Sequence, residues 1–406
     1  MNSSQVQRSG DPRESVLRML SLATFVIFFQ AFMVAPIIPR LSEVFGVSPQ
    51  EIGLIVPAYL IPYGIATLVY GLLADRLGLW RIMAASLLAF AVLTALTATA
   101  RSVQELVLWR LLTGLGASGV VPLALVLVAR LYSYEQRGRP LGWIFGAMAG
   151  GMAFGSTFGA LLEPYVGWQG LFLSVGAIGL MMLIILLPHR EIIANALQSV
   201  GGGLGALFRG YRDLLSTARG RRTYTYVFVN SIFHSGVFTW LGLYLERHYE
   251  LGPVGIGLAL LGYGIPGFLF GPAIGRAADR YGRSRLIPLG LALGAIAAAA
   301  LVADMPLFAA AAAITVLSLG YDMTQPLFAG LVTSIGAQRP GQAMGLNVFM
   351  LFVGFGLGSL VFGELLRQGF TQALAVFAAV ELVLAFAAIA LFRAEVPAST
   401  TTMKRT

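Results

Sequence analysis

Apolar residues in this chain form long, nearly uninterrupted runs instead of the short alternating patterns of a soluble fold. A helix needs roughly 20 apolar residues to cross the hydrocarbon core of a bilayer. The runs predict twelve such helices, at residues 18–39, 52–74, 81–99, 103–129, 140–162, 170–188, 223–245, 253–275, 286–303, 306–332, 341–366 and 370–392. We therefore expect an all-α membrane protein in which twelve transmembrane helices form two six-helix bundles.

The same pattern predicts five segments along the chain. They are a cytoplasmic N-terminus (1–17), an N-terminal six-helix bundle (18–188), a central cytoplasmic loop (189–222), a C-terminal six-helix bundle (223–392) and a cytoplasmic C-terminal tail (393–406). Basic residues set this orientation, because Lys and Arg accumulate in the cytoplasmic loops of membrane proteins. With both termini inside, most of the 27 Lys and Arg residues fall on the cytoplasmic side. We expect a multi-pass protein of the bacterial inner membrane with both termini in the cytoplasm.

Composition excludes several classes of protein. The chain is 57% hydrophobic and only 11% charged, and its mean hydropathy is +0.81, so it has too little polar surface for a soluble domain. The net charge of +9 is explained by topology and by contact with anionic lipid, so we expect no nucleic-acid binding. Because Lys404 is the only lysine, no phosphate-binding P-loop exists, and we expect no nucleotide partner.

Candidate chemistry of other kinds is also missing from the sequence. The chain has no cysteine, and its three histidines show no metal-ligand spacing, so we expect neither a metal nor a cofactor. The predicted spans contain no paired aspartates, no His–Glu cluster and no Ser–Lys dyad, so an intramembrane enzyme is not expected.

An internal repeat divides the chain in two. The segment GLLADRLGLWR (71–81) matches GRAADRYGRSR (275–285) at an offset of 279 − 75 = 204 residues. The same offset pairs Pro62 with Pro266 and Pro122 with Pro326. The pattern indicates a tandem duplication of a six-helix unit, and an even number of helices gives two parallel halves facing each other across a central path.

Three segments of the chain resemble motifs of one known family. GLLADRLGLWR resembles the signature between helices 2 and 3 of the major facilitator superfamily, and LVLWRLLTGLGAS (106–118) resembles its helix 4 motif. GMAFGSTFGALLEPYVGWQGLF (151–172) is similar to the helix 5 motif of its proton-coupled exporters, although Ser156 stands where that motif usually has proline. The resemblance extends from Leu17 to Arg393 and implies alternating access around a central cavity lined by helices 1, 4, 7 and 10.

The stretch 318–332 places a carboxylate inside an apolar run. A charged residue in lipid is costly, so Asp322 indicates a function. Pro326 frees a backbone carbonyl near it, which is typical of a kinked helix lining a cavity. Helical spacing predicts one polar stripe along this helix, made of Thr315, Ser318, Asp322 and Gln325. The repeat equivalent of Asp322 is Ser118, so the acid is present in one half only.

A carboxyl group in such a place can take up a proton from one side of the membrane and release it to the other. Asp322 is therefore the main proton-coupling candidate, although a permanently ionised Asp322 would instead bind a cationic substrate. His234, in the middle of the seventh helix, is a second proton-coupling candidate. Glu381, in the middle of the twelfth helix, is a third, with a neutral packed acid as the alternative.

Other polar residues are candidates for the substrate cavity. The offset of 204 pairs His234 with Gln30, which occupies a helix 1 position where the family often has an acid. Asn230 lies one turn before His234, and Arg110 lies inside the fourth helix. We expect these residues to line the cavity with Ser318, Asp322 and Gln325, while packing of His234 and snorkelling of Arg110 remain the alternatives.

Two further sets of residues are predicted to serve conformational change. The resemblance implies a latch between the halves, formed by Gly71, Asp75, Arg76, Gly78, Arg81, Arg130, Asp279 and Arg280. Glycines at a spacing of four allow helices to approach closely, and they predict a packing or sliding surface at Gly151, Gly155 and Gly159.

These features favour a proton-coupled antiporter that exports small amphiphilic organic molecules. An importer or facilitator for a sugar or organic acid is the alternative, since Arg110 suits an anion. A receptor or scaffold on the same fold is a third possibility. The expected partners are a small-molecule substrate, protons and membrane lipid.

Overall fold

The computed structural model describes residues 12–132, 138–195 and 204–395, and no strand occurs within these ranges. The predicted termini (1–17 and 393–406) and central loop (189–222) therefore lie partly outside the described residues. The first half contains α1 (Pro12–Phe32), η1 (Ala35–Ile37), α2 (Ile38–Phe45), α3 (Pro49–Gly53), α4 (Ile55–Leu77), α5 (Leu79–Thr97), α6 (Val103–Ala117), α7 (Val120–Leu131), α8 (Gly138–Leu186), η3 (Leu187–His189) and α9 (Arg190–Asn195).

The second half repeats this arrangement after one additional helix. It contains α10 (Leu204–Ser216), α11 (Ala218–Tyr249), α12 (Pro253–Ala259), α13 (Ile265–Tyr281), α14 (Arg283–Ala300), α15 (Leu307–Ile335), α16 (Pro340–Leu365), η4 (Leu366–Gln368) and α17 (Phe370–Leu391). The segment predicted as a central loop is thus partly helical, in α9 and α10, and α11 begins five residues before the predicted start at 223.

The all-α fold with twelve spans is confirmed. Nine helical stretches of the described chain are long and apolar enough to cross a membrane by themselves. One of them, α8, holds the fifth and sixth spans, which are separated by non-helical backbone at Gly167 (φ 70°, ψ 163°). α11 supplies the seventh span, and α12 with α13 supplies the eighth. Neither of these two spans is among the nine, because α11 contains many polar residues and the eighth span is broken between α12 and α13.

The duplication is visible in the backbone. Gly78 links α4 to α5 with φ 96° and ψ 136°, and Gly282 links α13 to α14 with φ 85° and ψ 150°. Gly46 and Glu250 both take the left-handed conformation after α2 and α11, and they too are 250 − 46 = 204 residues apart. The two halves therefore share their turns as well as their helices. The segment 71–81, expected as a loop, is reduced to one non-helical residue because α4 continues to Leu77.

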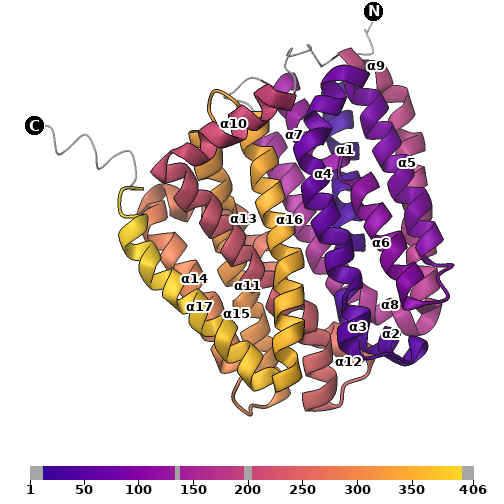
Figure 1. Ribbon diagram of the computed structural model, residues 1–406, viewed down its shortest axis with the longest axis vertical. Coiled ribbons are helices and arrows are strands. Elements are labelled where there is room, and N and C mark those ends of the chain that lie inside the picture. Colours follow the sequence, from indigo (N-terminus) through magenta and orange to yellow (C-terminus); the bar gives the residue numbers. More distant parts are fainter. Residues whose placement is uncertain (1–11, 133–137, 196–203, 396–406) are drawn as a thin grey trace, which may run out of the picture.

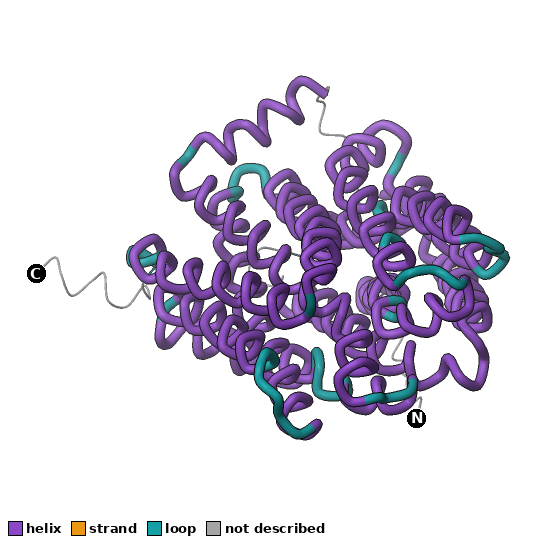
Figure 2. Tube along the Cα trace, turned by 60° about the horizontal axis from the view of Figure 1, so that its bottom comes forward, coloured by secondary structure: helices purple, strands orange, loops and turns teal. Residues whose placement is uncertain are grey.

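The two halves lie side by side, with α16 of the second half packed along α4 of the first (Figure 1). α8 of the first half also packs against α12 and α13 of the second. The start of α1 and the end of α17 lie toward the same end of the bundle as α10, whereas α2, α3 and α12 lie at the opposite end (Figure 1). Figure 2 shows that short loops join the helices around this bundle.

Close helix packing within the first half depends on the predicted glycine series. A Cβ built on Gly151, Gly155 or Gly159 would lie 2.5 Å from a backbone oxygen of α1 or of the residue that follows it. These glycines therefore let α8 lie directly against α1, and whether this surface also slides stays a prediction.

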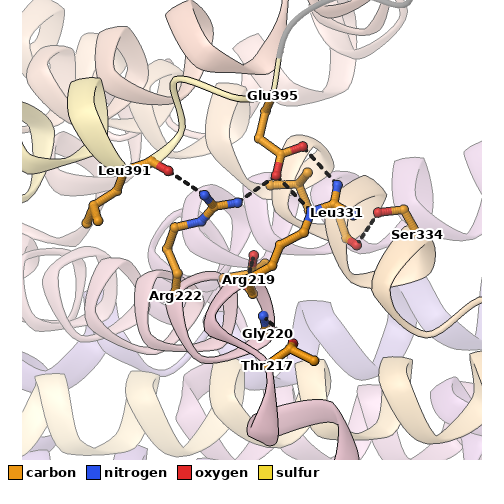
Figure 3. A network of polar contacts seen from close by, with 9 residues as sticks. Thr217, Arg219, Gly220, Arg222, Leu331, Ser334, Leu391 and Glu395 are labelled. Atoms are coloured by element: carbon orange, nitrogen blue, oxygen red, sulfur yellow. Dashed lines mark hydrogen bonds and ion pairs between the residues drawn. The ribbon is translucent and has the colours of Figure 1, made fainter.

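A polar network anchors the end of α17, at the end of the bundle where α1 begins (Figure 3). The Glu395 carboxylate accepts hydrogen bonds from Arg219 Nε at 2.8 Å and from Arg222 Nη2 at 2.6 Å. Arg222 also donates to the Leu391 carbonyl, and the Glu395 carbonyl accepts from the Ser284 amide at 3.1 Å. A residue shortly after α17 thus joins that helix to the starts of α11 and α14.

Candidate functional site

The Asp322 carboxylate lies at the N-terminus of α13. Its Oδ2 accepts a hydrogen bond from the Gly267 amide at 2.9 Å and another from the Ser318 hydroxyl at 2.9 Å. The Ser318 hydroxyl in turn accepts from the Gly264 amide at 2.7 Å. A residue of α15 therefore caps a helix in another part of the chain, and we name these four residues the α13 cap.

Local sequence explains why α13 begins inside the membrane. Gly264 takes the left-handed conformation (φ 77°, ψ −17°), and Pro266 stands in the first turn of the helix, where its missing N–H costs nothing. The first amides of a helix have no partner within the helix and carry partial positive charge. They therefore attract the carboxylate of Asp322. The apolar pattern did not predict this break, although the stretch GYGIPG (262–267) within a predicted span was the signal for it.

His234 lies close to the cap through two tyrosines. Its ring stacks on the Tyr321 ring with centroids 3.6 Å apart, and its Nε2 lies 2.7 Å from the Tyr263 hydroxyl. The His234 side chain is only 1% exposed. Tyr321 precedes Asp322 in α15 and Tyr263 precedes Gly264, so His234 and the α13 cap form one continuous polar cluster. Tyr263 and Tyr321 were not predicted.

The other candidates in the second half, Asn230, Gln325 and Glu381, make contacts different from those of His234 and the α13 cap. Asn230 donates to the Thr324 hydroxyl at 2.8 Å, which joins α11 to α15. Gln325 is partly buried, and its amide nitrogen has no hydrogen-bond partner among the described residues. Glu381 is 1% exposed in α17, and its Oε2 has no partner in the described chain.

Arg110 lies in the first half, between α6 and α4. Its guanidinium carbon is 4.3 Å from the centroid of the Tyr59 ring, and its Nε donates to the Ile55 carbonyl at 3.2 Å. The side chain is fully buried, so it does not snorkel to an interface. Gln30, in α1, is also fully buried, and neither of its polar atoms has a partner within the described ranges.

A row of aromatic rings lies between Arg110 and His234. From Tyr59 the centroids are separated by 5.8 Å to Tyr63, 4.2 Å to Phe352, 5.9 Å to Phe355 and 5.7 Å to His234. No hydrogen bond or ion pair joins Arg110 to His234 or Asp322 in the described chain. The structure thus brings His234 and Asp322 together and leaves Arg110 on the other side of an aromatic row that crosses from α4 to α16.

The predicted latch residues lie near the ends of α4, α7 and α13. Asp75 is partly buried in the last turn of α4, and the charge of Arg130, at the end of α7, acts on it. Arg76 and Arg81 are at least partly exposed, and Arg280 lies over the Tyr281 ring at 5.3 Å. The side chain of Asp279 lies outside the described part of the chain. A latch between the halves stays a prediction.

Comparison with known proteins decides the family. The sequence model described as Major Facilitator Superfamily matches residues 20–257 and 227–405. The chain belongs to this superfamily. Proteins of this family are transporters and not enzymes, so the expectation that the chain is not an enzyme is confirmed.

Relatives of this chain within the superfamily are named for different substrates. The chain is 26% identical over 388 residues to the "Probable sulfoacetate transporter SauU" of Cupriavidus necator, covering 88% of each chain. It is 25% identical over 345 residues to the "Quinolone resistance protein NorA" of Staphylococcus aureus (strain COL), covering 84% of this chain and 87% of the relative. The solved structure of a mutant of the nucleoside transporter NupG covers 94% of this chain and 100% of its own with a TM-score of 0.75, and at 14% identity it shows the fold alone.

Proposed function

We propose that this transporter is a proton-coupled antiporter that exports small amphiphilic organic molecules from the cytoplasm by alternating access. The observation that carries the proposal is the α13 cap, because a carboxylate within a membrane-spanning bundle holds the start of a broken helix. The distribution of basic residues supports a bacterial inner-membrane protein with both termini in the cytoplasm.

A proton on Asp322 would change how α13 is held. The ionised carboxylate accepts hydrogen bonds from Gly267 and Ser318 and is attracted by the partial positive charge of the helix N-terminus. A protonated carboxyl has no net charge, so this attraction falls. Proton binding and release at Asp322 therefore bias the position of α13.

The start of α13 also lies at a contact between the halves. A Cβ built on Gly264 would lie 2.5 Å from the Cβ of Ala153, which belongs to α8 of the first half. A change in the α13 cap therefore alters the packing of Gly264 against Ala153, where the two halves meet. This contact links protonation of Asp322 to a relative movement of the halves, as alternating access requires.

An importer or facilitator for a sugar or organic acid is the second candidate, and the similarity to a probable sulfoacetate transporter favours it. The name of the quinolone resistance protein favours export of an amphiphilic molecule instead. Solute flux in proteoliposomes, with and without an imposed pH gradient, separates the two. An antiporter accumulates solute against its gradient when protons move the other way, whereas a facilitator only equilibrates it.

The role of Asp322 is tested by Asp322→Asn, which mimics a permanently protonated carboxyl. Proton-driven transport should be lost, while exchange of solute without net proton movement survives. The control is Glu381→Gln, which neutralises a buried acid of α17 and should leave coupling intact. If Asp322→Asn still moves protons at the wild-type rate when substrate is added, Asp322 does not couple protons to transport.

A further inference from the structure

The Arg110 guanidinium is buried without an opposite charge. Its exposed fraction is 0%, and neither of its terminal nitrogens, Nη1 and Nη2, has a hydrogen-bond partner among the described residues. Its Nε bond to the Ile55 carbonyl satisfies one of its five N–H groups. A buried charge is normally paired, because removing it from water without compensation is very unfavourable.

Two tyrosine hydroxyls of α4 also lack a partner: that of Tyr59, whose ring contacts Arg110, and that of Tyr63, one turn further along the helix. Tyr59 and Tyr63 are fully buried, and neither hydroxyl has a partner in the part of the chain that the structure describes. The Arg110 guanidinium lies on the Tyr59 ring, and the Tyr63 ring is the next one along α4. Several unused donors thus lie on neighbouring turns of α4 and on the adjacent α6, and we name these three residues the Arg110 cluster.

We propose that the Arg110 cluster binds the carboxylate of an organic anion and that this anion is the transported substrate. A guanidinium presents two parallel N–H groups that match the two oxygens of a carboxylate, and tyrosine hydroxyls donate further hydrogen bonds. The Tyr59 ring covers one face of the guanidinium, so its edge is the part left for the ligand. The assignment rests on the proposed function only in taking a small organic molecule as the substrate.

The apolar part of the substrate has a place next to this cluster. Tyr63 stacks on Phe352 at 4.2 Å, and Phe352 lies 5.7 Å from Phe28. Tyr63 belongs to the first half and Phe352 to the second, so separation of the halves exposes these two rings, one turn along α4 from the Tyr59 ring that contacts the guanidinium. The site therefore fits an amphiphilic anion, with its carboxylate on Arg110 and its apolar body between the aromatic rings.

The first experiment measures the thermal unfolding midpoint of the purified full-length protein with matched ligand sets. The probes are benzoate, phenylacetate, octanoate and gluconate, each compared with its own amide, and phenethylammonium as a cation. At least one carboxylate should raise the wild-type midpoint, while its amide and the cation do not. No stabilisation by any of the four carboxylates, or equal stabilisation by the amides, overturns the proposal.

Arg110→Gln separates a ligand-binding arginine from a structural one. Removal of an unpaired buried charge should raise the midpoint of the ligand-free protein and abolish the carboxylate effect. The control Arg101→Gln removes an exposed arginine just before α6 and should change neither property. A lower ligand-free midpoint for Arg110→Gln, or a failure of this variant to fold, indicates a structural arginine and contradicts the proposal.

Arg110→Lys provides a second measurement, because it keeps the charge and removes the fork. Loss of one charge-assisted hydrogen bond should weaken carboxylate binding by about 10- to 100-fold. Unchanged affinity in this variant overturns the bidentate site. The anion site and the proton role of Asp322 can fail separately. If the Asp322→Asn variant still binds carboxylates and still couples protons to transport, only the proton role of Asp322 is refuted. Proton-driven transport of a neutral or cationic solute without carboxylate binding removes only the anion site.

Discussion

Ser318→Ala tests whether the α13 cap holds the eighth span in place. The Ser318 hydroxyl accepts from the Gly264 amide at 2.7 Å and donates to Asp322 at 2.9 Å, and the side chain is 1% exposed. Alanine fits the same space, so the change removes two hydrogen bonds with little effect on packing. It leaves the Gly264 amide buried without an acceptor and deprives Asp322 of one donor.

The expected loss of stability follows from these two contacts. A buried amide without a partner costs about 1–3 kcal/mol, and a hydrogen bond to a carboxylate contributes about 1.5–3 kcal/mol when the acid is ionised. The two effects share one hydroxyl, so we expect the free energy of unfolding to fall by about 2–4 kcal/mol. Unfolding by detergent titration, followed by tryptophan fluorescence, measures this difference, and proton-driven transport should slow in the same variant.

Ser334→Ala is the matched control on the same helix. The Ser334 hydroxyl bonds to the Leu331 carbonyl of its own helix, at 2.8 Å (Figure 3). Its removal should change the free energy of unfolding by less than about 0.5 kcal/mol. If Ser318→Ala is as stable as Ser334→Ala and transports at the wild-type rate, the cap does not hold α13.

Two further changes test the backbone and the anchored end of the chain. Gly264→Ala should lower the free energy of unfolding by at least about 1–2 kcal/mol, because its φ is 77° and Ala153 blocks a Cβ, whereas Gly252→Ala meets no neighbour and keeps an ordinary φ of −73°. Equal stability of these two variants would contradict the strained start of α13. Burial alone would raise the pKa of Glu395, but hydrogen bonds from Arg219 and Arg222 and the charges of both hold that pKa below the ordinary 4.5. Because the folded-state pKa is depressed, Glu395 stabilises the fold above pH 4.5 and loses this effect as the pH falls below it, so Glu395→Gln should cost about 1 kcal/mol at pH 7 and nothing at low pH. A stability difference that does not shrink in acid would refute this role.

The membrane fold was predictable because its main signals are local. A span is recognised by the length of one apolar run, and the number of spans follows from counting the runs. The repeat was also readable, because Gly78 and Gly282 stand at one offset in two similar motifs and take the same turn in the structure. The boundaries were less accurate, since a continuous helix such as α4 passes beyond the apolar run into polar residues.

The site was only partly predictable, because its contacts join residues far apart in the chain. The sequence identified Asp322 as an unusual acid in a polar stripe, since lipid penalises a charge wherever it occurs. Which groups it bonds depends on how α13 is broken and turned toward α15, and Gly267 is 322 − 267 = 55 residues away. Likewise, the sequence singled out Arg110, but only the packing of α6 on α4 places it on Tyr59 without a counter-charge. The sequence by itself determined which residues are costly to bury, and the tertiary structure decided which of them are paired and which are left to bind something else.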